Sequence, residues 1–436
     1  MTDLKIAITP HRKALLAGHD NELDVLVRVK APPPSNDLPK RQPLNLSLVI
    51  DRSGSMHGQP LEEAKRCALM IVDSLDSEDL VSLVTYDNRT TIDVASRKVG
   101  DRRSLHLAIN AINAGGTTAL YDGWYQGAGQ ASQGVEQASM SRVLLLSDGR
   151  ANSGLTDPLQ IEQYCASMAE VGVTTSTYGL SQHFNEELMV QMARAGLGNS
   201  YYGQTAEDLM DPFREEFELL QNLCARRLRL SLETPSEITV KVLNGYPSDE
   251  DGSWRLPDLA YGGEAWAAVR LRIPYSAEQV KQEILKASVV FETLDGSVQS
   301  LEPEVIALPW LPQEAYLAVA TDPLVAERVG ELQAADLQDQ ARVAARRGDW
   351  KRVDALLSRA RREAENNPWL RESLEVLKKY AAQRESEFLA KEVKFSSAKL
   401  RNRLADANEG VGNYQENLES SKAAYLRRKR EQGKKF

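Results

Sequence analysis

The chain has 436 residues, 42% of them hydrophobic and 26% charged, and a formal net charge of −9. This length exceeds one ordinary hydrophobic core, so we expect two or three domains. The acidic balance argues against a general nucleic-acid-binding protein, and no stretch approaches the roughly 20 apolar residues of a membrane-spanning helix.

The first predicted module is a group of β-strands at the start of the chain. Alternating polar and apolar residues between Leu4 and Ala31, as in ELDVLVRVKAP, are typical of half-buried strands. A Pro-rich stretch, APPPSNDLPKRQP, separates these strands from the next module. We expect residues 1–43 to supply strands to a β-sandwich that is completed later in the chain.

Residues 44–223 alternate between short β-rich runs and longer helical segments. Strands are predicted at 44–50, 79–87, 90–96, 141–148, 172–180 and 199–204. Apolar residues spaced three and four apart predict helices at 60–75, 102–112, 118–132, 157–171 and 185–196, with a final helix from Ala206 to Leu223. This order indicates an α/β domain with a doubly wound, mostly parallel sheet, whose ligands bind beyond the carboxyl ends of the strands.

After this domain the helical period disappears. Segments such as RRLRLSLETPSEITVKVLNGY and EILKASVVFETLDGSVQSL alternate polar with apolar residues and contain Asn-Gly and Asp-Gly turns. Residues 224–312 are therefore predicted to form an antiparallel β-sandwich. The α/β domain would be an insertion in this sandwich, because the same β-pattern lies on both sides of it.

The last predicted module, residues 313–436, is helical. Apolar residues from Leu370 to Ala381 follow the spacing of an amphipathic helix, and breaks at RRGDW, NNPW and NEGVGN divide the region into three or four helices. The end of the chain, from Lys422 to Phe436, carries seven basic residues against one glutamate. A solvated tail and a contact for phosphate or an acidic partner are the two interpretations of this basic end.

Small oxygen-bearing side chains lie near the predicted strand ends of the α/β domain. The stretch LVIDRSGSMHG places Asp51, Ser53 and Ser55 at alternate positions where the first strand ends. NAGGTTALYDG places Thr117 after paired glycines, and VLLLSDGRANSG places Asp148 at the end of a neighbouring strand. Because the carboxyl ends of parallel strands meet at one edge of a sheet, we expect these side chains to converge.

Two carboxylates and three hydroxyl groups make a small, hard and incompletely charged set of metal ligands. Such a set suits Mg²⁺ or Mn²⁺, with Ca²⁺ as a further candidate, and does not suit zinc or copper. So few anionic ligands should leave one coordination position for an outside oxygen. A carboxylate from another protein would supply the missing charge.

The motifs DxSxS, GGTT and SDG, in this order and on this strand and helix pattern, resemble those of a von Willebrand factor A (VWA) domain with a metal-ion-dependent adhesion site. The resemblance covers the chain from about Leu44 to Leu223. By this resemblance some of the site residues would touch the metal directly, and the others would often contact it through a water molecule. The direct ligands would be Ser53, Ser55 and Thr117, and the water-mediated ones Asp51 and Asp148.

The same resemblance extends to neighbouring residues and modules. It implies that Tyr121 and Asp122 pack against and cap the helix after GGTT, while His57 is expected to face solvent. Beyond the VWA-like segment the likeness is looser. Bacterial proteins similar to this one join a VWA domain to a β-sandwich made from both flanks and to helices, as inter-α-trypsin inhibitor heavy chains partly do.

These features predict a Mg²⁺-dependent interaction or adaptor protein that binds an Asp or Glu of a partner protein. The alternative is a substrate adaptor subunit of a chelatase-like AAA+ ATPase assembly, because the chain itself lacks a GxxxxGK[ST] phosphate loop. A metal-dependent hydrolase and RNA binding are weaker alternatives. The five histidines form no catalytic motif, and basic residues are not interleaved with aromatic ones, so we expect neither an enzyme nor a nucleic-acid-binding protein.

The cysteines bear on the compartment of the protein. Cys67, Cys165 and Cys224 are widely spaced and lie in no CxxC or Cys/His cluster, which predicts buried, reduced thiols. The first segment, Met1 to Asp20, lacks the apolar run of a secretory signal. Together these features predict a cytoplasmic protein.

Overall fold

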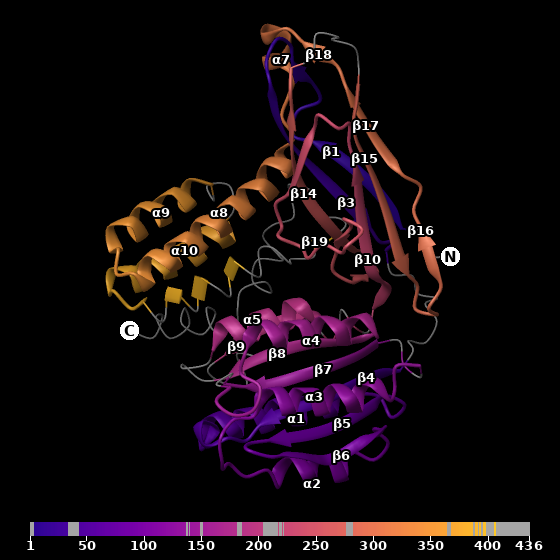
Figure 1. Cartoon of the computed structure of the whole chain (residues 1–436), viewed down its shortest axis with the longest axis vertical. Coiled ribbons are helices and arrows are strands. Elements are labelled where there is room, and N and C mark those ends of the chain that lie inside the picture. Colours follow the sequence, from indigo (N-terminus) through magenta and orange to yellow (C-terminus); the bar gives the residue numbers. More distant parts are fainter. Residues whose placement is uncertain are drawn as a thin grey trace. The chain divides into compact units, whose positions relative to one another are not determined.

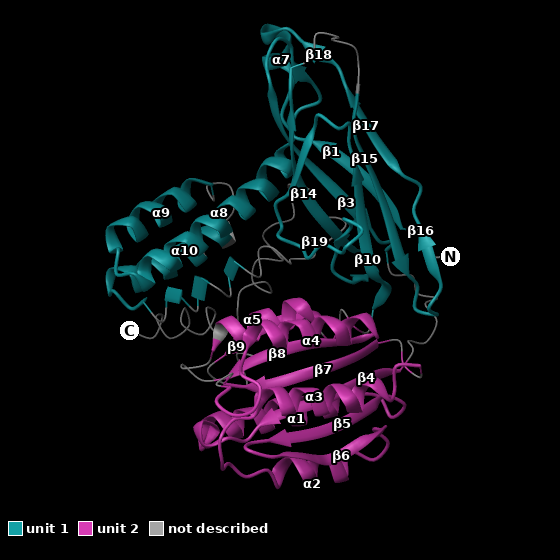
Figure 2. Cartoon of the chain, in the orientation of Figure 1, with its two compact units in different colours: residues 1–38, 222–418 teal, residues 39–221, 419–436 magenta. Residues whose placement is uncertain are grey.

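The computed structural model describes residues 4–33, 43–136, 138, 140–148, 151–180, 185–203, 217, 220, 222–275, 282–363, 368–386, 389, 390, 392, 393, 396, 397, 405 and 406. Among them, residues 4–33 and those from 222 onward form one compact unit, and residues 43–220 form the other (Figure 2). The basic end from Lys422 to Phe436 and most of the helix predicted from Ala206 lie outside the described residues. Leu223, predicted to end that helix, begins a strand instead.

The unit of residues 43–220 is built on a sheet with the strand order β6-β5-β4-β7-β8-β9 (Figure 1). These strands are β4 (Leu44–Asp51), β5 (Leu80–Tyr86), β6 (Thr90–Lys98), β7 (Met140–Ser147), β8 (Val173–Leu180) and β9 (Leu197–Gly203). Neighbouring strands run parallel except β5 and β6, which are antiparallel. The predicted α/β fold with a mostly parallel sheet is confirmed.

Helices cover this sheet on both faces. They are α1 (Gln59–Ser74), α2 (Arg103–Asn110), α3 (Leu120–Ser132), α4 (Pro158–Glu170) and α5 (Glu186–Ala195), and a short 3-10 helix, η1 (Gly54–Met56), follows β4. Every residue of β4 and β7 is buried, as expected for central strands covered on both sides. On one face, Val49 and Tyr86 share a core with Trp124 of α3 and with residues of α4 and α5.

The other unit contains two antiparallel sheets that enclose a shared hydrophobic core. One sheet has the order β1-β3-β14-β11, with β19 beside β14; the other has the order β12-β10-β15-β16, with β13 beside β10 and β17 beside β15 (Figure 1). The strands are β1 (Lys5–Pro10), β3 (Asn21–Lys30), β10 (Leu223–Glu233), β11 (Thr239–Val242), β12 (Trp254–Arg255), β13 (Leu259–Ala260), β14 (Gly263–Ile273), β15 (Gln282–Glu292), β16 (Val298–Ser300), β17 (Glu304–Leu308) and β19 (Ala405–Asp406).

The N-terminal strands are an integral part of this sandwich. β3 pairs with β14 along its whole length, from Asn21 opposite Ile273 to Lys30 opposite Glu264. A long edge-to-edge pairing between segments more than 200 residues apart makes the α/β unit an insertion within the sandwich, which is one of the two arrangements, inserted in or flanked by the sandwich, that the sequence predicts.

A second contact joins the N-terminal region to the segment just before the helices. β2 (Leu15–Leu16) pairs in parallel with β18 (Trp310–Leu311), which leads into α7 (Gln313–Ala318). Arg12 donates a hydrogen bond of 2.8 Å to the carbonyl oxygen of Tyr316, and its guanidinium group lies 4.8 Å from the centre of the Tyr316 ring. These contacts fix the start of the helical region on the sandwich.

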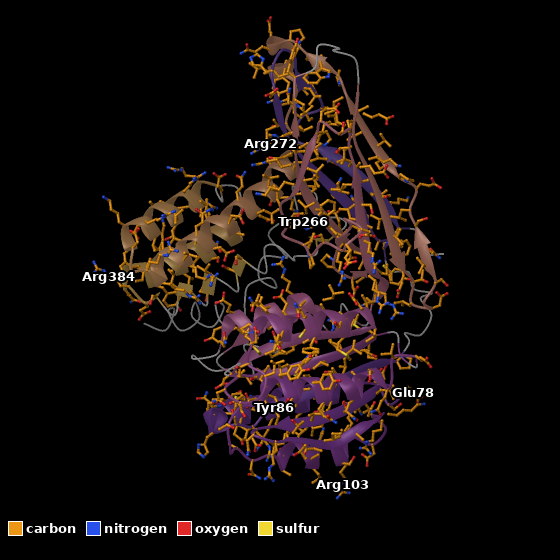
Figure 3. All side chains as sticks on the ribbon, in the orientation of Figure 1. Glu78, Tyr86, Arg103, Trp266, Arg272 and Arg384 are labelled. Carbon is orange, nitrogen blue, oxygen red and sulfur yellow. The ribbon has the colours of Figure 1, made fainter. Side chains whose placement is uncertain are left out.

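The helical region follows as α8 (Pro323–Arg346), α9 (Trp350–Glu363) and α10 (Pro368–Ala382), which share a core of their own. α8 packs on the sandwich through Val325 and Val329, which belong to one hydrophobic cluster with the buried Trp266 of β14 (labelled in Figure 3). Arg328 lies 5.1 Å from the Trp266 ring and pairs with Glu331 at 3.2 Å. The predicted C-terminal helices are present, whereas β19 is a strand that its two-residue length hid from the sequence analysis.

Two further predictions concern cysteines and membranes. Cys67, Cys165 and Cys224 are buried, as predicted, and burial raises the pKa of Cys224 to about 12. None of the helices in the described part of the chain combines the length and apolar character that a bilayer span requires.

Candidate metal-binding site

Three neighbouring strands end at the edge of the sheet where the site was predicted. Asp51 is the last residue of β4 and pairs with Tyr86, the last residue of β5 (labelled in Figure 3). Ser147 ends β7, and Asp148 follows it. All four side chains are buried. The structure thus brings the two predicted carboxylate residues, Asp51 and Asp148, to one edge of the sheet.

Asp51 is fully buried and held by two hydrogen bonds. Its Oδ1 accepts from the backbone amide of Ser53 at 2.8 Å, and its Oδ2 accepts from the hydroxyl group of Ser147 at 2.6 Å. Burial nevertheless raises the pKa of Asp51 to about 6, and the negative charge of Asp148 adds to this effect against the hydrogen bonds. A positive ion near these two carboxylates would remove that electrostatic penalty.

The predicted serines lie on the turn that follows β4. Ser53 Oγ is 3.1 Å from Ser55 Oγ, so the two hydroxyl groups are close enough to coordinate the same metal ion. Ser53 is buried and Ser55 is exposed, while the buried Met56 anchors the short helix that contains Ser55. The two serines of this turn therefore bring their hydroxyl groups together, one on a buried residue and one on an exposed residue.

The threonine loop is joined to the serine loop by its backbone. Gly54 N donates to Gly116 O at 3.0 Å, and Gly115 N donates to Arg52 O at 2.8 Å. Gly116 has a φ of +74°, and a Cβ atom there would lie 2.7 Å from Asn88 Oδ1, so only glycine fits this turn. These contacts bring the loop carrying the exposed Thr117 beside the loop carrying Ser55.

Thr118 is a structural residue of the same loop. Its amide donates to Asn152 Oδ1 at 2.8 Å, and its carbonyl oxygen accepts from the amides of Asn152 and Ser153 at 3.1 and 3.2 Å. The segment after Asp148 is therefore tied to the threonine loop. The serine motif is joined to the threonine motif by backbone hydrogen bonds, and it is joined to Ser147 by the hydrogen bond from that hydroxyl group to Asp51.

The structure adds residues that the sequence analysis did not single out. Ser147 positions Asp51, and its signal in the sequence is a polar residue directly after the apolar run Val143–Leu146. Arg52 forms an ion pair of 3.0 Å with Asp87, which links the serine loop to the end of β5. The phenol of Tyr86 is buried beside the same groups, and burial raises its pKa, as do the charges of Asp51 and Asp148.

This arrangement fits a hard divalent cation such as Mg²⁺ better than zinc or copper. Within the described residues, no group of three or more His, Cys, Asp and Glu side chains gathers in a way that could hold a metal. The edge of the sheet offers two buried carboxylates, several hydroxyl groups and the buried phenol of Tyr86. Hydroxyl and carboxylate oxygens are ligands of Mg²⁺, Mn²⁺ and Ca²⁺.

Three neighbouring residues were also assigned roles from the sequence. His57 is exposed, as expected. The predicted capping of α3 is wrong, because Ala119 occupies the N-cap position without a side-chain hydrogen bond. Asp122 lies in the first turn, where a carboxylate interacts favourably with the helix dipole, and Tyr121 packs against the rings of Tyr125 and Tyr164 and against the core that contains Trp124.

Comparison with known proteins bears on the domain that carries these residues. The model of the von Willebrand factor type A domain matches residues 45–215. The protein sll0103 of Synechocystis is 32% identical over 216 residues, which is 49% of each chain, so this chain spans about half the length of that curated relative.

Two solved structures share the wider fold. The von Willebrand factor type A protein from Catenulispora acidiphila has a TM-score of 0.68 at 18% identity and covers 84% of this chain and 89% of its own. The ArnB paralog VWA2 from Sulfolobus acidocaldarius has a TM-score of 0.62 at 16% identity and covers 90% of this chain and 98% of its own. At these identities the similarity concerns the fold alone. Residues 45–215 of this chain are a von Willebrand factor type A domain, a module of protein interaction and adhesion.

Proposed function

We propose that this chain is a Mg²⁺-dependent adaptor whose VWA domain binds a carboxylate of a partner protein. The five proposed metal ligands are Asp51, Ser53, Ser55, Thr117 and Asp148. The observation that carries the proposal is the burial of Asp51 close enough to Asp148 for their charges to interact, with a pKa raised to about 6. A bound Mg²⁺, or Mn²⁺ or Ca²⁺ in its place, would offset this repulsion and offer an open position to an Asp or Glu oxygen.

The proposed ligands differ in exposure, so the site has a buried side and a side that faces solvent. Asp51, Ser53 and Asp148 are buried, whereas Ser55 and Thr117 are exposed. A cation held by all five residues would therefore have the carboxylate ligands on its buried side and only neutral hydroxyl groups on the side that faces solvent. An incoming carboxylate would meet little repulsion on the outer side, which supports binding of an acidic side chain from solvent.

The surrounding residues favour binding over catalysis. A hydrolytic metal centre needs a nearby group that accepts a proton from bound water. At this edge of the sheet Asp51 is held by Ser53 and Ser147, and Asp87 is held by Arg52. We propose that these carboxylates position the loops and do not act as general bases, so the chain should not turn over phosphate or peptide substrates by itself.

We further propose that the adaptor works in the cytoplasm. All three cysteines are buried in the fold, which suits a compartment that keeps thiols reduced. Fractionation of cells that express the tagged full chain tests this location, with recovery in the cytoplasmic fraction as the expected result.

Affinity purification of the full chain with Mg²⁺ or with a chelator tests the proposed function. We expect a specific protein to be captured with Mg²⁺, released by chelator, and lost with Asp148→Ala. Ser82→Ala is a matched control, because Ser82 is also buried in the sheet but bonds to Ser47. Capture that survives verified removal of the metal would contradict the proposal, and the identity of the captured protein decides whether the partner is an AAA+ ATPase.

A further inference from the structure

Three tyrosines from two helices form a partly exposed aromatic cluster. The ring of Tyr121 in α3 lies 5.7 Å from the ring of Tyr125, stacked at 19°, and 5.1 Å from the ring of Tyr164 in α4. Tyr125 is 52% exposed and Tyr164 is 44% exposed. We call these three residues the tyrosine patch. Clustered, exposed aromatic rings on a folded domain are typical of surfaces that bind another protein.

The elements that form the tyrosine patch carry negative charge and no positive charge. Neither α3 nor α4 contains a lysine or arginine, and the segment 151–157 that leads into α4 contains none. The same elements carry Asp122 and Asp157, which are exposed, and Glu162, which is half-buried. A cation that approaches the rings would be attracted by these carboxylates and by the electron-rich faces of the tyrosines.

The tyrosine patch is positioned by the same backbone that forms the threonine loop. Tyr121 is three residues after Thr118, whose carbonyl oxygen accepts hydrogen bonds from Asn152 and Ser153 at 3.1 and 3.2 Å. Gly154 approaches Asp122 so closely that an added Cβ would lie 3.0 Å from Asp122 Oδ2. The segment before α4 is therefore held against the start of α3. This contact fixes the two tyrosine-bearing helices relative to the loop that carries Thr117, one of the proposed metal ligands.

We propose that the tyrosine patch binds an arginine side chain of the same partner whose carboxylate enters the metal site. This inference rests on the proposed function and deepens it, because it describes the partner segment as one that carries an arginine near an acidic residue. A guanidinium group is planar and weakly hydrated, so it can stack on an exposed ring while it bonds to a carboxylate such as Glu162. A lysine ammonium group is more strongly hydrated and cannot stack in this way.

The patch can be tested without the partner and without the metal. The full chain is labelled with ¹³C in its tyrosine rings, freed of metal with chelator, and titrated with Nα-acetyl-arginine amide while ring signals are followed by NMR. Nα-acetyl-citrulline amide is the matched probe, because its neutral urea group replaces the guanidinium group. Tyr275, which is 51% exposed in the sandwich unit, is the internal control for non-specific effects on exposed tyrosines.

We expect concentration-dependent shifts of the Tyr125 and Tyr164 signals with the arginine probe, smaller shifts with the citrulline probe, and no preference at Tyr275. The double variant Tyr125→Ala/Tyr164→Ala should abolish the preference at Tyr121. Equal responses to the two probes, or no response at the patch, would overturn the inference. The comparison of probes on the wild-type chain remains decisive even where the double variant fails to fold.

A peptide pair separates this inference from the proposed function. Ac-Asp-Gly-Gly-Arg-NH2 and its citrulline counterpart are titrated into the full chain with Mg²⁺ and with chelator. A two- to fivefold tighter binding of the arginine peptide, roughly the gain expected for an exposed cation–π contact, supports the patch. A preference that persists while Mg²⁺ adds nothing to affinity would refute the metal-dependent function alone, whereas Mg²⁺-dependent binding without a preference would refute the patch alone.

Discussion

The hydroxyl group of Ser147 donates a hydrogen bond of 2.6 Å to Asp51, and this contact joins the ends of two neighbouring strands. β4 and β7 are paired in parallel up to Ile50 and Leu146, so each strand delivers its next side chain to the same edge. The bond orients one carboxylate oxygen of Asp51 and leaves its other oxygen to the amide of Ser53. Ser147 therefore positions the carboxylate on which the proposed metal site depends.

Replacement of Ser147 should weaken metal binding without removing a ligand. In Ser147→Ala, Asp51 loses a donor that stabilises its charged form, so we expect Mg²⁺ affinity to fall about tenfold, the lower end of the range for residues that orient metal ligands. Calorimetric titration of Mg²⁺ into the variant measures the effect. Ser82→Ala also removes a buried serine hydroxyl, bonded to Ser47 at 2.9 Å, and should leave Mg²⁺ affinity unchanged. Equal losses in both variants would mean that Ser147 acts only through stability.

Neutralising Asp51 should stabilise the metal-free protein. The pKa of Asp51 is raised from its ordinary value of 3.8 to about 6, so between these values the folded chain keeps a proton that the unfolded chain releases. The contribution of Asp51 to stability therefore falls as pH rises through this window, by up to about 3 kcal/mol. In Asp51→Asn that loss is absent, because the amide carries no charge and the Ser147 hydroxyl group can rotate to accept from it.

Urea unfolding of the wild type and Asp51→Asn in chelator tests whether the charge of Asp51 destabilises the metal-free protein. The stability advantage of the variant should be small near pH 4, grow up to about pH 6, and stay constant above it. Added Mg²⁺ should stabilise the wild type at neutral pH and leave the variant unchanged. A variant that is less stable than wild type at neutral pH without metal would show that Asp51 is a structural carboxylate with a compensating charge in the fold.

Two adjacent glycines give a matched test of the threonine loop. Gly116→Ala is strained by the positive φ and by contact with Asn88, so the loop carrying Thr117 must shift. At Gly115 an added Cβ meets nothing within 4 Å. We expect Gly116→Ala to reduce Mg²⁺ affinity on the order of tenfold or more and Gly115→Ala to have little effect, as measured by calorimetry. Similar affinities for the two variants would argue against a role of this loop in metal binding.

A second pair of glycines tests the packing of α3 on β5. At Gly123 an added Cβ would lie 2.3 Å from Tyr86 Cδ1, whereas at Gly129 of the same helix nothing lies within 4 Å. Gly123→Ala should destabilise the protein by about 1–3 kcal/mol through overpacking. Gly129→Ala should stabilise it by up to about 1 kcal/mol, because alanine favours the helix. Thermal or urea unfolding measures both changes, and a stable Gly123→Ala would mean that Tyr86 has room to move.

The parts of the fold that could be predicted from the sequence are those with a local signature. The run LNLSLVID is buried at every position, and such continuous β-rich runs between helices predicted the central strands and the α/β class correctly. The N-terminal strands could be assigned to the sandwich because their alternation matches the segment after Leu223. β19 is two residues long, which is too short for any pattern to show, and it forms only because β14 offers a partner.

The candidate site shows the same division between local and long-range information. Asp51, Ser53 and Ser55 stand out because their spacing is local, and so does Thr117 after its paired glycines. Ser147 and Tyr86 do not stand out, because their roles depend on the register of β4 with its two neighbours. The tyrosine patch likewise joins residues from two helices, so the sequence favoured simple packing for Tyr121.

Isothermal titration of Mg²⁺ into the metal-free full chain, compared with Asp148→Ala, tests the central claim most directly. We expect the wild type to bind one Mg²⁺ and Asp148→Ala to lose that binding while it keeps a cooperative unfolding transition, because Asp148 lies beyond the end of β7 and outside the core. Ser82→Ala should bind as the wild type does. Absence of Mg²⁺ binding to the wild type, or equal binding to Asp148→Ala, would contradict the account and leave a VWA fold without a working metal site.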